Sequence, residues 1–366
     1  MPQWIETADA LAAHFSERPA RIGLDTEFVR ERTFWPQLAL VQIAIDDTIL
    51  LIDPLKPGMT DALADVLGAP DILKVMHSAS EDVVAIKHAC GVVPAPLFDT
   101  QIAAAIAGVG AGMGYQKLVE QITGVALAKG ETRSDWLRRP LSESQLHYAA
   151  DDVRYLFALH DSLSARLLES GRGDWQHEDS QRLLENSQQD DGERWPHLSM
   201  RSAQFLDADG QRRLLRLLRW RDVQARRNDK PRSWILDNEM AATLARTPPA
   251  DRLALVRWLD TQPKSPRKLA DALWTALSTP VEDEAQAPLA RTASDRDKTR
   301  LKQLQDAVAR QSEALGLPDG VLASRRSLEA LLEARRESPH AWPDNLAGWR
   351  RQQLEPLLAP VLATTD

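Results

Sequence analysis

Residues 21–29, 37–45 and 48–55 read RIGLDTEFV, QLALVQIAI and TILLIDPL, three apolar runs that follow one another closely. Short apolar runs separated by turn signals are typical of β-strands. Strands joined by short loops pair in antiparallel fashion, because parallel neighbours need a long crossover connection. A fourth strand is predicted at ILKVMHS, residues 72–78. From this point on, strands alternate with helical patterns, and such crossover connections suggest parallel neighbours. The stretch therefore predicts a mixed sheet with antiparallel and parallel neighbours.

Helical patterns follow in the first half of the chain and occupy the rest of it. In the first half they are ASEDVVAIKHAC (79–90), DTQIAAAIAG (99–108) and SESQLHYAADDVRYLFALHDSL (142–163). Strand patterns end at about residue 165, and two polar stretches look like linkers, ENSQQDDGERWPHLSM (185–200) and STPVEDEAQAPLARTASD (278–295). We expect an α/β domain with its linker at 1–200, and two small all-helical domains at 201–285 and 286–366.

Composition narrows the class of protein. A chain of 366 residues exceeds one typical domain, and 43% apolar with 27% charged residues is typical of soluble globular proteins. The single cysteine, Cys90, excludes an intrachain disulfide and a cysteine metal cluster. No apolar run approaches the length of a transmembrane helix, and no secretory leader is evident, so we expect a cytoplasmic protein. The net charge of −8 does not indicate nucleic acid as a partner, although phosphate binding depends on local patches.

The first run carries two acids, Asp25 and Glu27, two residues apart. On a strand both carboxylates project from one face. Leu24 and Phe28 flank them, and two like charges beside an apolar core are costly unless a cation compensates. The pair alone leaves two interpretations open: an edge strand with a solvated face, or a divalent-metal site, since hard oxygen ligands suit magnesium or manganese.

Two further acids stand where a predicted strand leads into a predicted helix. Asp82 lies in the first turn after the strand at 72–78, where an acid complements the helix dipole. Ligand sites of α/β sheets also occur at such strand ends, so Asp82 is equally a candidate ligand. Asp99 occupies a similar turn, and we interpret it as a helix cap.

Residues 146–160, LHYAADDVRYLFALH, offer two acids, a tyrosine and a histidine within one predicted helix. Each residue advances about 100° around a helix, so Leu146, Val153 and Phe157 fall on one apolar stripe. Asp152 lies nearest this stripe, with Tyr148 one turn earlier on the same flank. Asp151 points nearly opposite and His147 lies on the other flank. The geometry predicts a Tyr148–Asp152 pair.

Four carboxylates in the order Asp, Glu, Asp, Asp, with a tyrosine four residues before the last, are far more specific than any one alone. At this point the chain resembles the DEDD superfamily of 3′-5′ exonucleases, and specifically the ribonuclease D family. The superfamily has a histidine branch with H-x-A-x-x-D and a tyrosine branch with Y-x-x-x-D, and residues 147–152 satisfy both. The context FVRERTFWPQLALVQ (28–42) is similar to the tyrosine branch. The likeness rests on LDTEFVRERTFWPQLALVQIA (24–44), VMHSASEDVVAI (75–86), FDTQIAAAIAG (98–108) and LHYAADDVRYL (146–156).

The resemblance implies a ribonuclease-H-like exonuclease domain whose carboxylates bind two divalent metal ions, Mg²⁺ or Mn²⁺. Asp25 would contact both ions, Glu27 and Asp152 would hold the one near the attacking water, and Asp82 would help to hold the other, largely through water. Tyr148 would orient that water, since an ordinary tyrosine is a poor base at neutral pH. The products would be nucleoside 5′-monophosphates, released from a free 3′-hydroxyl end. His147 is expected at the surface.

Substrate contacts are predicted in two places. Phe34 and Trp35 follow the acidic strand, where an aromatic ring could stack on the terminal base or simply pack the domain. A basic cluster, QRRLLRLLRWRDVQARRNDKPR (211–232), suits a phosphate backbone; alternatively it is a solvated helix face paired with acids elsewhere. The arginines predicted to contact RNA are Arg216, Arg219, Arg226 and Arg227.

The helical part of the chain adds a second likeness. Residues 217–249 are similar to the helicase-and-ribonuclease-D C-terminal (HRDC) domain, a helical nucleic-acid-binding module. Residues 297–366 resemble it only faintly, and we expect this degenerate copy to pack against the catalytic domain more than to bind RNA.

The leading hypothesis is a 3′-5′ exoribonuclease that acts as a cytoplasmic monomer on transfer RNA precursors, with no membrane partner. A DNA exonuclease of the Werner type is the alternative, because such relatives share the tyrosine-branch motifs. A non-catalytic RNA-binding protein is a third hypothesis, which the intact carboxylates argue against.

Overall fold

The structure, a computed structural model, describes residues 2–128, 130–131, 134–189, 192–292 and 294–363. These residues contain a mixed six-stranded sheet in the order β1-β4-β3-β2-β5-β6. β2 pairs antiparallel with β3, β3 antiparallel with β4, and β5 parallel with β2, as the strand spacing predicted. β6, which the sequence analysis did not predict, pairs parallel with β5. The strands are β1 (Gln3–Ile5), β2 (Arg21–Val29), β3 (Gln37–Ile45), β4 (Thr48–Ile52), β5 (Leu73–Met76) and β6 (Leu97–Asp99).

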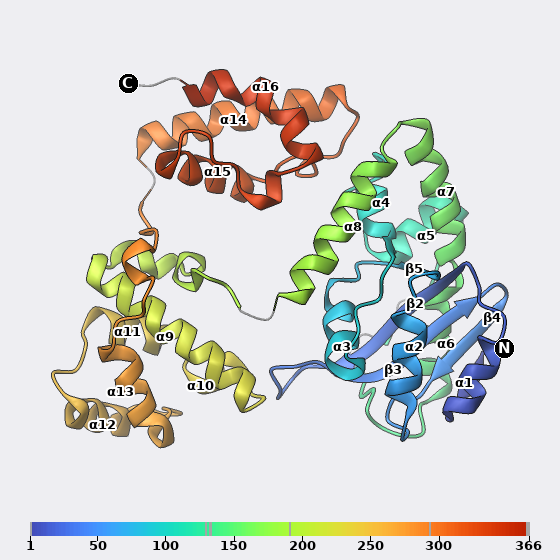
Figure 1. The fold of residues 1–366 in the computed structure, drawn as a ribbon, viewed down its shortest axis with the longest axis horizontal. Helices are drawn as coiled ribbons and strands as arrows, with labels where there is room; N and C mark the ends of the chain where they lie inside the picture. The colour runs from blue at the N-terminus through green and yellow to red at the C-terminus, as the bar shows by residue number, and fades with distance from the viewer. Residues whose placement is uncertain (1, 129, 132–133, 190–191, 293, 364–366) are drawn as a thin grey trace. The chain divides into compact units, whose positions relative to one another are not determined.

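Helices cover both faces of this sheet, with α1, α2 and α3 in front and α6 behind in Figure 1. Leu24 of β2 packs with the front helices, whereas Leu40 of β3 shares a cluster with Ala149 and Val153 of α6. Successive side chains of a strand alternate between faces, so Asp25 and Glu27 project toward α6. The helices are α1 (Ala8–His14), α2 (Met59–Leu67), α3 (Ser80–Cys90), α4 (Thr100–Ile106), α5 (Tyr115–Thr123), α6 (Glu143–Arg154), α7 (Leu156–Glu169) and α8 (Gly173–Gln188).

The single helix predicted over 142–163 is instead two helices, α6 and α7, with a break at Tyr155. The hydroxyl of Tyr115 donates a hydrogen bond to the Asp151 carbonyl (3.0 Å) and accepts one from the Tyr155 N–H (3.2 Å). In an uninterrupted helix these two backbone groups would bond each other directly. The inserted side chain therefore explains why α6 ends just after Asp152.

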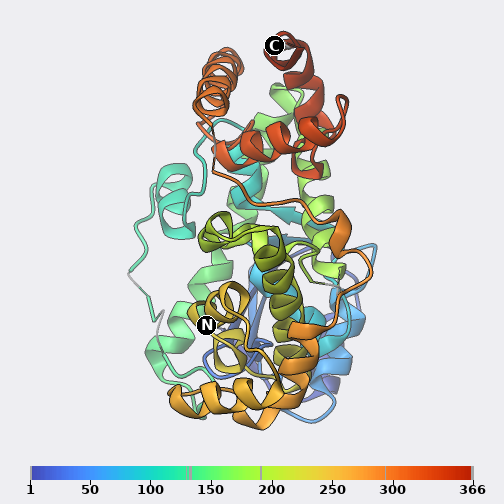
Figure 2. The same ribbon diagram turned by 90° about the vertical axis from the view of Figure 1, so that its left-hand side faces the viewer.

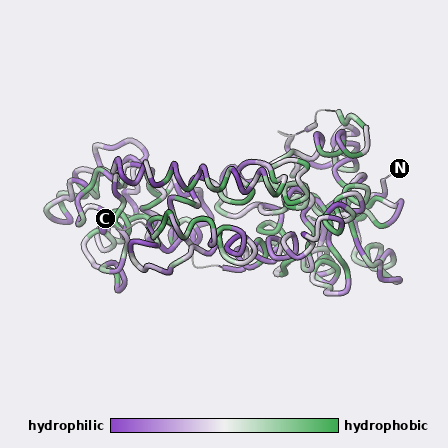
Figure 3. Tube along the Cα trace, turned by 90° about the horizontal axis from the view of Figure 1, so that it is seen from above, coloured by the Kyte–Doolittle hydropathy of each residue, from purple (hydrophilic) through white to green (hydrophobic). Residues whose placement is uncertain are grey.

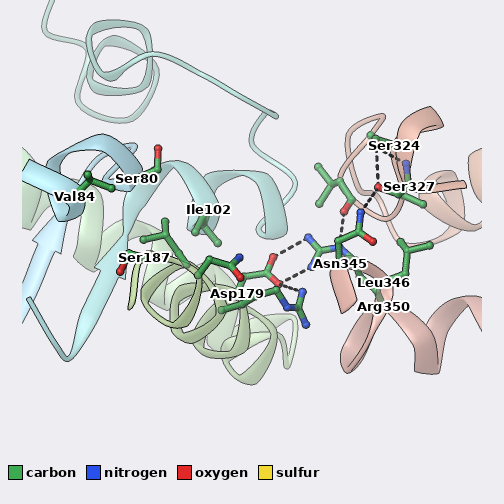
Figure 4. Close-up of a pocket in the computed structure, with 16 residues that line it drawn as sticks. Ser80, Val84, Ile102, Asp179, Ser187, Ser324, Ser327, Asn345, Leu346 and Arg350 are labelled. Carbon is green, nitrogen blue, oxygen red and sulfur yellow. Dashed lines mark hydrogen bonds and ion pairs between the residues drawn. The ribbon is translucent and has the colours of Figure 1, made fainter. Parts of the chain in front are cut away.

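By their contacts, residues Met1–Val29, Gln37–Gln188 and Ser294–Asp366 form one compact unit, which we call unit 1. Its last part comprises α14 (Asp295–Ala314), α15 (Arg325–Glu337) and α16 (Trp349–Ala363). The two nitrogens of the Arg350 fork donate to Asp179 of α8 at 2.5 and 2.7 Å (Figure 4). The Trp349 ring stacks on Trp175, with 4.4 Å between the ring centroids. The last helical segment thus packs on the α/β domain, as we expected, while the two predicted domain boundaries stay a prediction.

Residues Arg30–Pro36 and Gln189–Ala293 form the other compact unit, unit 2. Its helices, yellow-green to orange in Figures 1 and 2, pack around a core that includes Leu214, Leu244 and Leu273. Apolar and polar stretches alternate along the helices in Figure 3, as amphipathic packing requires. None of the helices described is long and apolar enough to cross a membrane. The helices of unit 2 are α9 (Ala208–Arg227), α10 (Arg232–Ile235), α11 (Asn238–Arg246), α12 (Arg252–Thr261) and α13 (Ala270–Ser278).

The loop 30–36, which joins β2 to β3, is held in unit 2 by apolar contacts and hydrogen bonds. The Phe34 side chain, only 4% exposed, packs on Ala225 and Ile235. One carboxylate oxygen of Asp229 accepts the N–H groups of both Phe34 and Trp35 at 3.0 Å.

Candidate active site

Three of the four predicted carboxylates meet between the sheet and α6. Asp25 and Glu27 come from β2 and Asp152 from α6, and each offers an oxygen atom within 4.8 Å of the others. All three side chains are partly buried. Strand alternation supplies the first two acids on one face, and the apolar register of α6 turns Asp152 toward them. Three hard oxygen donors at this spacing have the chemistry of a divalent-cation site.

Asp82, the fourth predicted carboxylate, lies outside this group of three. It occupies the first turn of α3, is 8% exposed, and accepts a hydrogen bond from the Thr26 hydroxyl at 2.5 Å. Thr26 stands between Asp25 and Glu27 and projects from the other face of β2. Asp82 still raises the pKa of Asp25 through its charge, so the four acids form one electrostatic cluster.

The pKa values of all four acids are raised, and withdrawal from water is the largest cause in each case. The pKa of Asp25 is well above its usual range, because the charges of Asp82 and Asp152 add to burial. The pKa rises to about 8 for Glu27, about 7 for Asp152 and about 6 for Asp82, where the Thr26 hydrogen bond opposes the shift. Carboxylates this close repel one another when ionised, and a bound cation would relieve that repulsion. The cluster therefore fits a divalent metal.

Tyr148 and Asp152 influence each other, as expected for neighbours on one flank of α6: the Tyr148 side chain lowers the pKa of Asp152, against the larger effect of burial. Burial and the charges of Asp152 and Glu27 raise the pKa of Tyr148, so its phenol is protonated at neutral pH. A cavity of about 260 Å³ opens beside this pair. A protonated phenol at the edge of a cavity can orient a water molecule but does not act as a strong base.

The two residues that compete with this pair in the sequence lie elsewhere on α6. Asp151 forms an ion pair with Arg154 at 2.8 Å, and its side chain is 41% exposed. His147 is exposed at the rim of the same cavity. Asp99 caps α4 by accepting the N–H groups of Gln101 and Ile102, which confirms its interpretation as a cap.

Sequence reasoning missed two residues that hold the acids in place, Thr26 and Tyr115. The signal for Thr26 was available, because a polar residue between two acids on a strand must project from the opposite face. Tyr115 gave no signal, since its hydroxyl reaches backbone groups 36 and 40 positions further along the chain.

The two aromatic residues predicted to contact substrate, Phe34 and Trp35, differ in how far they are exposed to solvent. Phe34 is buried on Ala225 and Ile235, which favours the packing alternative for this ring. Trp35 is partly buried and meets Phe34 edge to face, with ring centroids 4.8 Å apart.

Most of the predicted RNA-binding arginines are paired with acids. The Arg216 fork bonds both oxygens of Glu284 at 2.5 and 2.6 Å, and Arg219 bonds both oxygens of Asp283 at 2.6 and 3.1 Å. Both acids belong to the stretch 278–295, which reads as a linker in the sequence. For these two arginines the structure favours the ion-pair alternative. Arg226 bonds Asp222 at 2.7 Å, and Arg227 is exposed.

Two family models match the chain. One, described as a 3′-5′ exonuclease, matches residues 2–168. The other, described as the C-terminal HRDC domain of ribonuclease D, matches residues 297–358, within the segment whose likeness to HRDC domains is only faint by inspection.

Whole-chain relatives agree with these models. The chain is 64% identical to ribonuclease D of Xanthomonas oryzae pv. oryzae over 100% of both chains, and 35% identical to ribonuclease D of Pseudomonas paraeruginosa over 96% of this chain and 95% of that one. The crystal structure of Escherichia coli RNase D, described as an exoribonuclease involved in structured RNA processing, superposes with a TM-score of 0.86 at 30% identity, covering 99% of this chain and 98% of that one. The catalytic core of RRP6 from Trypanosoma brucei shares the fold, with a TM-score of 0.58 at 22% identity over 78% of this chain and 80% of that one.

Proposed function

The chain belongs to the ribonuclease D family, and from this premise we infer that it is a metal-dependent 3′-5′ exoribonuclease. The observation that carries the assignment of its active site is the grouping of Asp25, Glu27 and Asp152, with Tyr148 lining the same cavity as Asp152. We propose these residues and Asp82 as the catalytic set.

The four carboxylates would hold two divalent ions, Mg²⁺ or Mn²⁺. Asp25 would be shared, Glu27 and Asp152 would complete one site, and Asp82 would serve the other. The separation of Asp82 from the group of three supports this division. Such ions, when bound, lower the pKa of a water molecule and stabilise negative charge on a leaving oxygen. The chain's own part is to hold the four acids close together, where bound ions would offset the burial and repulsion that raise their pKa values, and to favour hard cations by an all-oxygen donor set.

Tyr148 would orient the attacking water molecule and would not act as a base. Its raised pKa keeps the phenol protonated, so the hydroxyl can donate to Asp152 and accept from a water molecule in the adjoining cavity. Orienting that water for attack on the last phosphodiester bond would release one nucleoside 5′-monophosphate and leave a new 3′-hydroxyl end.

For the natural substrate we propose transfer RNA precursors, trimmed at their 3′ ends by a monomeric enzyme in the cytoplasm. Support comes from the full-length likeness to ribonuclease D proteins, one of which is described as acting in structured RNA processing. A DNA exonuclease of the Werner type is the alternative, since the acid cluster itself does not distinguish the two sugars.

Adjacent aspartates of α6 supply a matched test. End-labelled RNA with a free 3′-hydroxyl is incubated with Mn²⁺ or Mg²⁺ and the wild type, Asp152→Asn or Asp151→Asn. We expect ladders of mononucleotide release from the wild type and from Asp151→Asn, because Asp151 faces Arg154 rather than the acid cluster. Asp152→Asn should lose at least two orders of magnitude in rate, since it removes a ligand charge and the partner of Tyr148.

Three further arms complete the experiment. A chelator should stop the reaction, and a 3′-phosphate end should block it. A DNA oligonucleotide of the same sequence should be degraded more slowly than the RNA. Faster loss of DNA would reverse the substrate assignment, and full activity of Asp152→Asn would refute the assignment of the metal site.

A further inference from the structure

A second polar pocket lies within unit 2, where the loop 30–36 meets the helices. Its volume is about 460 Å³, and no member of the acid cluster lines it. Residues from three segments form it: the loop itself, α9, and the stretch that runs from α10 to the start of α11. Their side chains are the guanidinium groups of Arg30, Arg221 and Arg232, the hydroxyls of Thr33 and Ser233, and the amide of Asn238.

The lining is strongly cationic. Three arginines face one carboxylate, Glu31, among the described residues that line the pocket. The Asp222 carboxylate accepts a hydrogen bond from Arg232 Nε at 2.5 Å and another from Arg226 Nε at 2.7 Å. The single negative charge of Asp222 is therefore shared between two cations. Among the described residues that line this concave space, cationic side chains therefore outnumber carboxylates, and such a space attracts opposite charge most strongly.

Arg221 is the group whose hydrogen bonding is incomplete. Its Nη1 atom donates to the Leu236 carbonyl (3.2 Å) and to Asn238 Oδ1 (2.7 Å). Its Nε atom is buried and has no hydrogen-bond partner among the described residues. Burial and the charge of Arg232 lower the pKa of Arg221. A buried charged donor without an acceptor is costly, which indicates a missing acceptor of negative charge.

The Phe34 ring holds two of the arginines in place. The guanidinium carbon of Arg232 lies 4.6 Å from the ring centroid and that of Arg30 lies 5.9 Å from it. Arg30 also donates through Nε to the Phe34 carbonyl at 2.8 Å. Cations over an aromatic face lose little further freedom when a ligand arrives, so the pocket is prepared for an anion before one binds.

We propose that the pocket of Arg30, Arg221 and Arg232 binds a phosphodiester group of the RNA. This inference rests on the proposed function and assigns the contact to residues other than Arg216 and Arg219, which Glu284 and Asp283 neutralise. Phosphate suits the pocket because each planar guanidinium group can offer several hydrogen-bond donors to the phosphate oxygens. The hydroxyls and the Asn238 amide that line the pocket add neutral contacts. The contact carries no sequence information, as expected for an exonuclease that accepts any base.

The test measures binding by the full chain without turnover. Anisotropy of a labelled single-stranded RNA is titrated in chelator, at several KCl concentrations, for the wild type, Arg232→Gln, Arg221→Lys and a control, Arg252→Gln. Arg252 belongs to unit 2, pairs with Asp271 and is absent from the pocket. Arg232 is 45% exposed, so its substitution is compatible with folding, and Arg221→Lys keeps the charge but loses the fork. Urea unfolding of each variant reports its folding.

We expect Arg232→Gln to weaken RNA binding about tenfold at low salt, and to reduce the slope of log Kd against log salt by about 0.7, the value for one phosphate contact on a single strand. Arg221→Lys should weaken binding several-fold with a smaller change of slope. The control should bind as the wild type does.

Equal binding by the pocket variants and the control would overturn the proposal. Inorganic phosphate, titrated by calorimetry at matched ionic strength, separates two anion sources. If the variants lose phosphate binding but keep RNA binding, the pocket is a site for a free anion and the RNA assignment is wrong. Hydrolysis of the same RNA in Mn²⁺ is recorded in parallel: its absence in the wild type would refute the proposed function, whereas the binding data test the pocket alone.

Discussion

Replacing Tyr115 by phenylalanine removes one oxygen atom from the point where α6 ends and α7 begins. That oxygen serves two backbone groups, the Asp151 carbonyl at 3.0 Å and the Tyr155 N–H at 3.2 Å. The Tyr155 N–H keeps a second acceptor, the Val153 carbonyl, so the main loss is at Asp151. A buried carbonyl left without a donor costs about 1–3 kcal/mol. Because part of the loss is compensated at Tyr155, we expect a value of about 1–2 kcal/mol.

Hydrogen exchange read by mass spectrometry measures this loss locally. Opening that is easier by about 1–2 kcal/mol accelerates exchange roughly 5- to 30-fold in peptides that cover residues 146–160. Peptides from α9, in unit 2, serve as an internal reference. Since Asp152 lies between the two bridged residues, we also expect a lower kcat with little change in KM, because the carboxylate is less firmly placed.

Tyr155→Phe is the matched control for this substitution. In the part of the chain that the structure describes, the Tyr155 hydroxyl has no hydrogen-bond partner, although the residue adjoins the same break. Its loss should change exchange by less than about twofold. If Tyr115→Phe and Tyr155→Phe exchange equally fast, the Tyr115 hydroxyl does not hold the helix end and the account of the break is wrong.

Three further predictions concern the acid cluster. Tyr148→Phe should reduce kcat at least a hundredfold, while His147→Ala should stay within about twofold, in single-turnover digestion of one RNA; equal effects would contradict the tyrosine assignment. Without metal, the urea midpoint should fall as pH rises from about 5 to about 8, because the raised pKa values of Glu27 (about 8) and Asp152 (about 7) mean that the folded state binds more protons than the unfolded state. Mn²⁺ should flatten this slope, and a midpoint that rises with pH would refute the sign. Thr26→Val should raise the pKa of Asp82 further, because it removes the hydrogen bond that lowers this pKa, and the acid limb of the pH–rate profile should then move to higher pH. An acid limb at the same pH would show that this hydrogen bond does not matter for turnover.

The long elements of the α/β domain were predictable because their signals are local. β2, β3 and β4 each read as an apolar run, and their short connections gave the antiparallel order. β1 and β6 have only three residues each, too few to show a period, so the sequence analysis did not predict them. The break between α6 and α7 was unpredictable for another reason: a distant side chain, that of Tyr115, causes it.

The candidate site divides in the same way. Strand alternation and helix register bring Asp25, Glu27 and Asp152 together, and both follow from residue spacing alone. The partners of Arg216 and Arg219 do not, because Glu284 and Asp283 lie more than sixty positions away in a polar stretch whose sequence shows no helical or strand pattern. Charge along a helix therefore predicts a basic face but not whether that face remains available to RNA.

The discontinuity of unit 1 has a consequence for synthesis of the chain. Its hydrophobic cluster runs from Leu40 on β3 through α7 to Leu358 on α16, yet residues 189–293 are made before the last helices. At about 5–20 residues per second, the ribosome needs roughly 5–20 s to add that intervening part. Throughout this interval the α/β domain carries an apolar surface that nothing later in the chain yet covers. A message truncated near residue 293 would fix that state permanently and deliver a nascent chain with every carboxylate of the acid cluster present and an exposed surface for chaperones or aggregation.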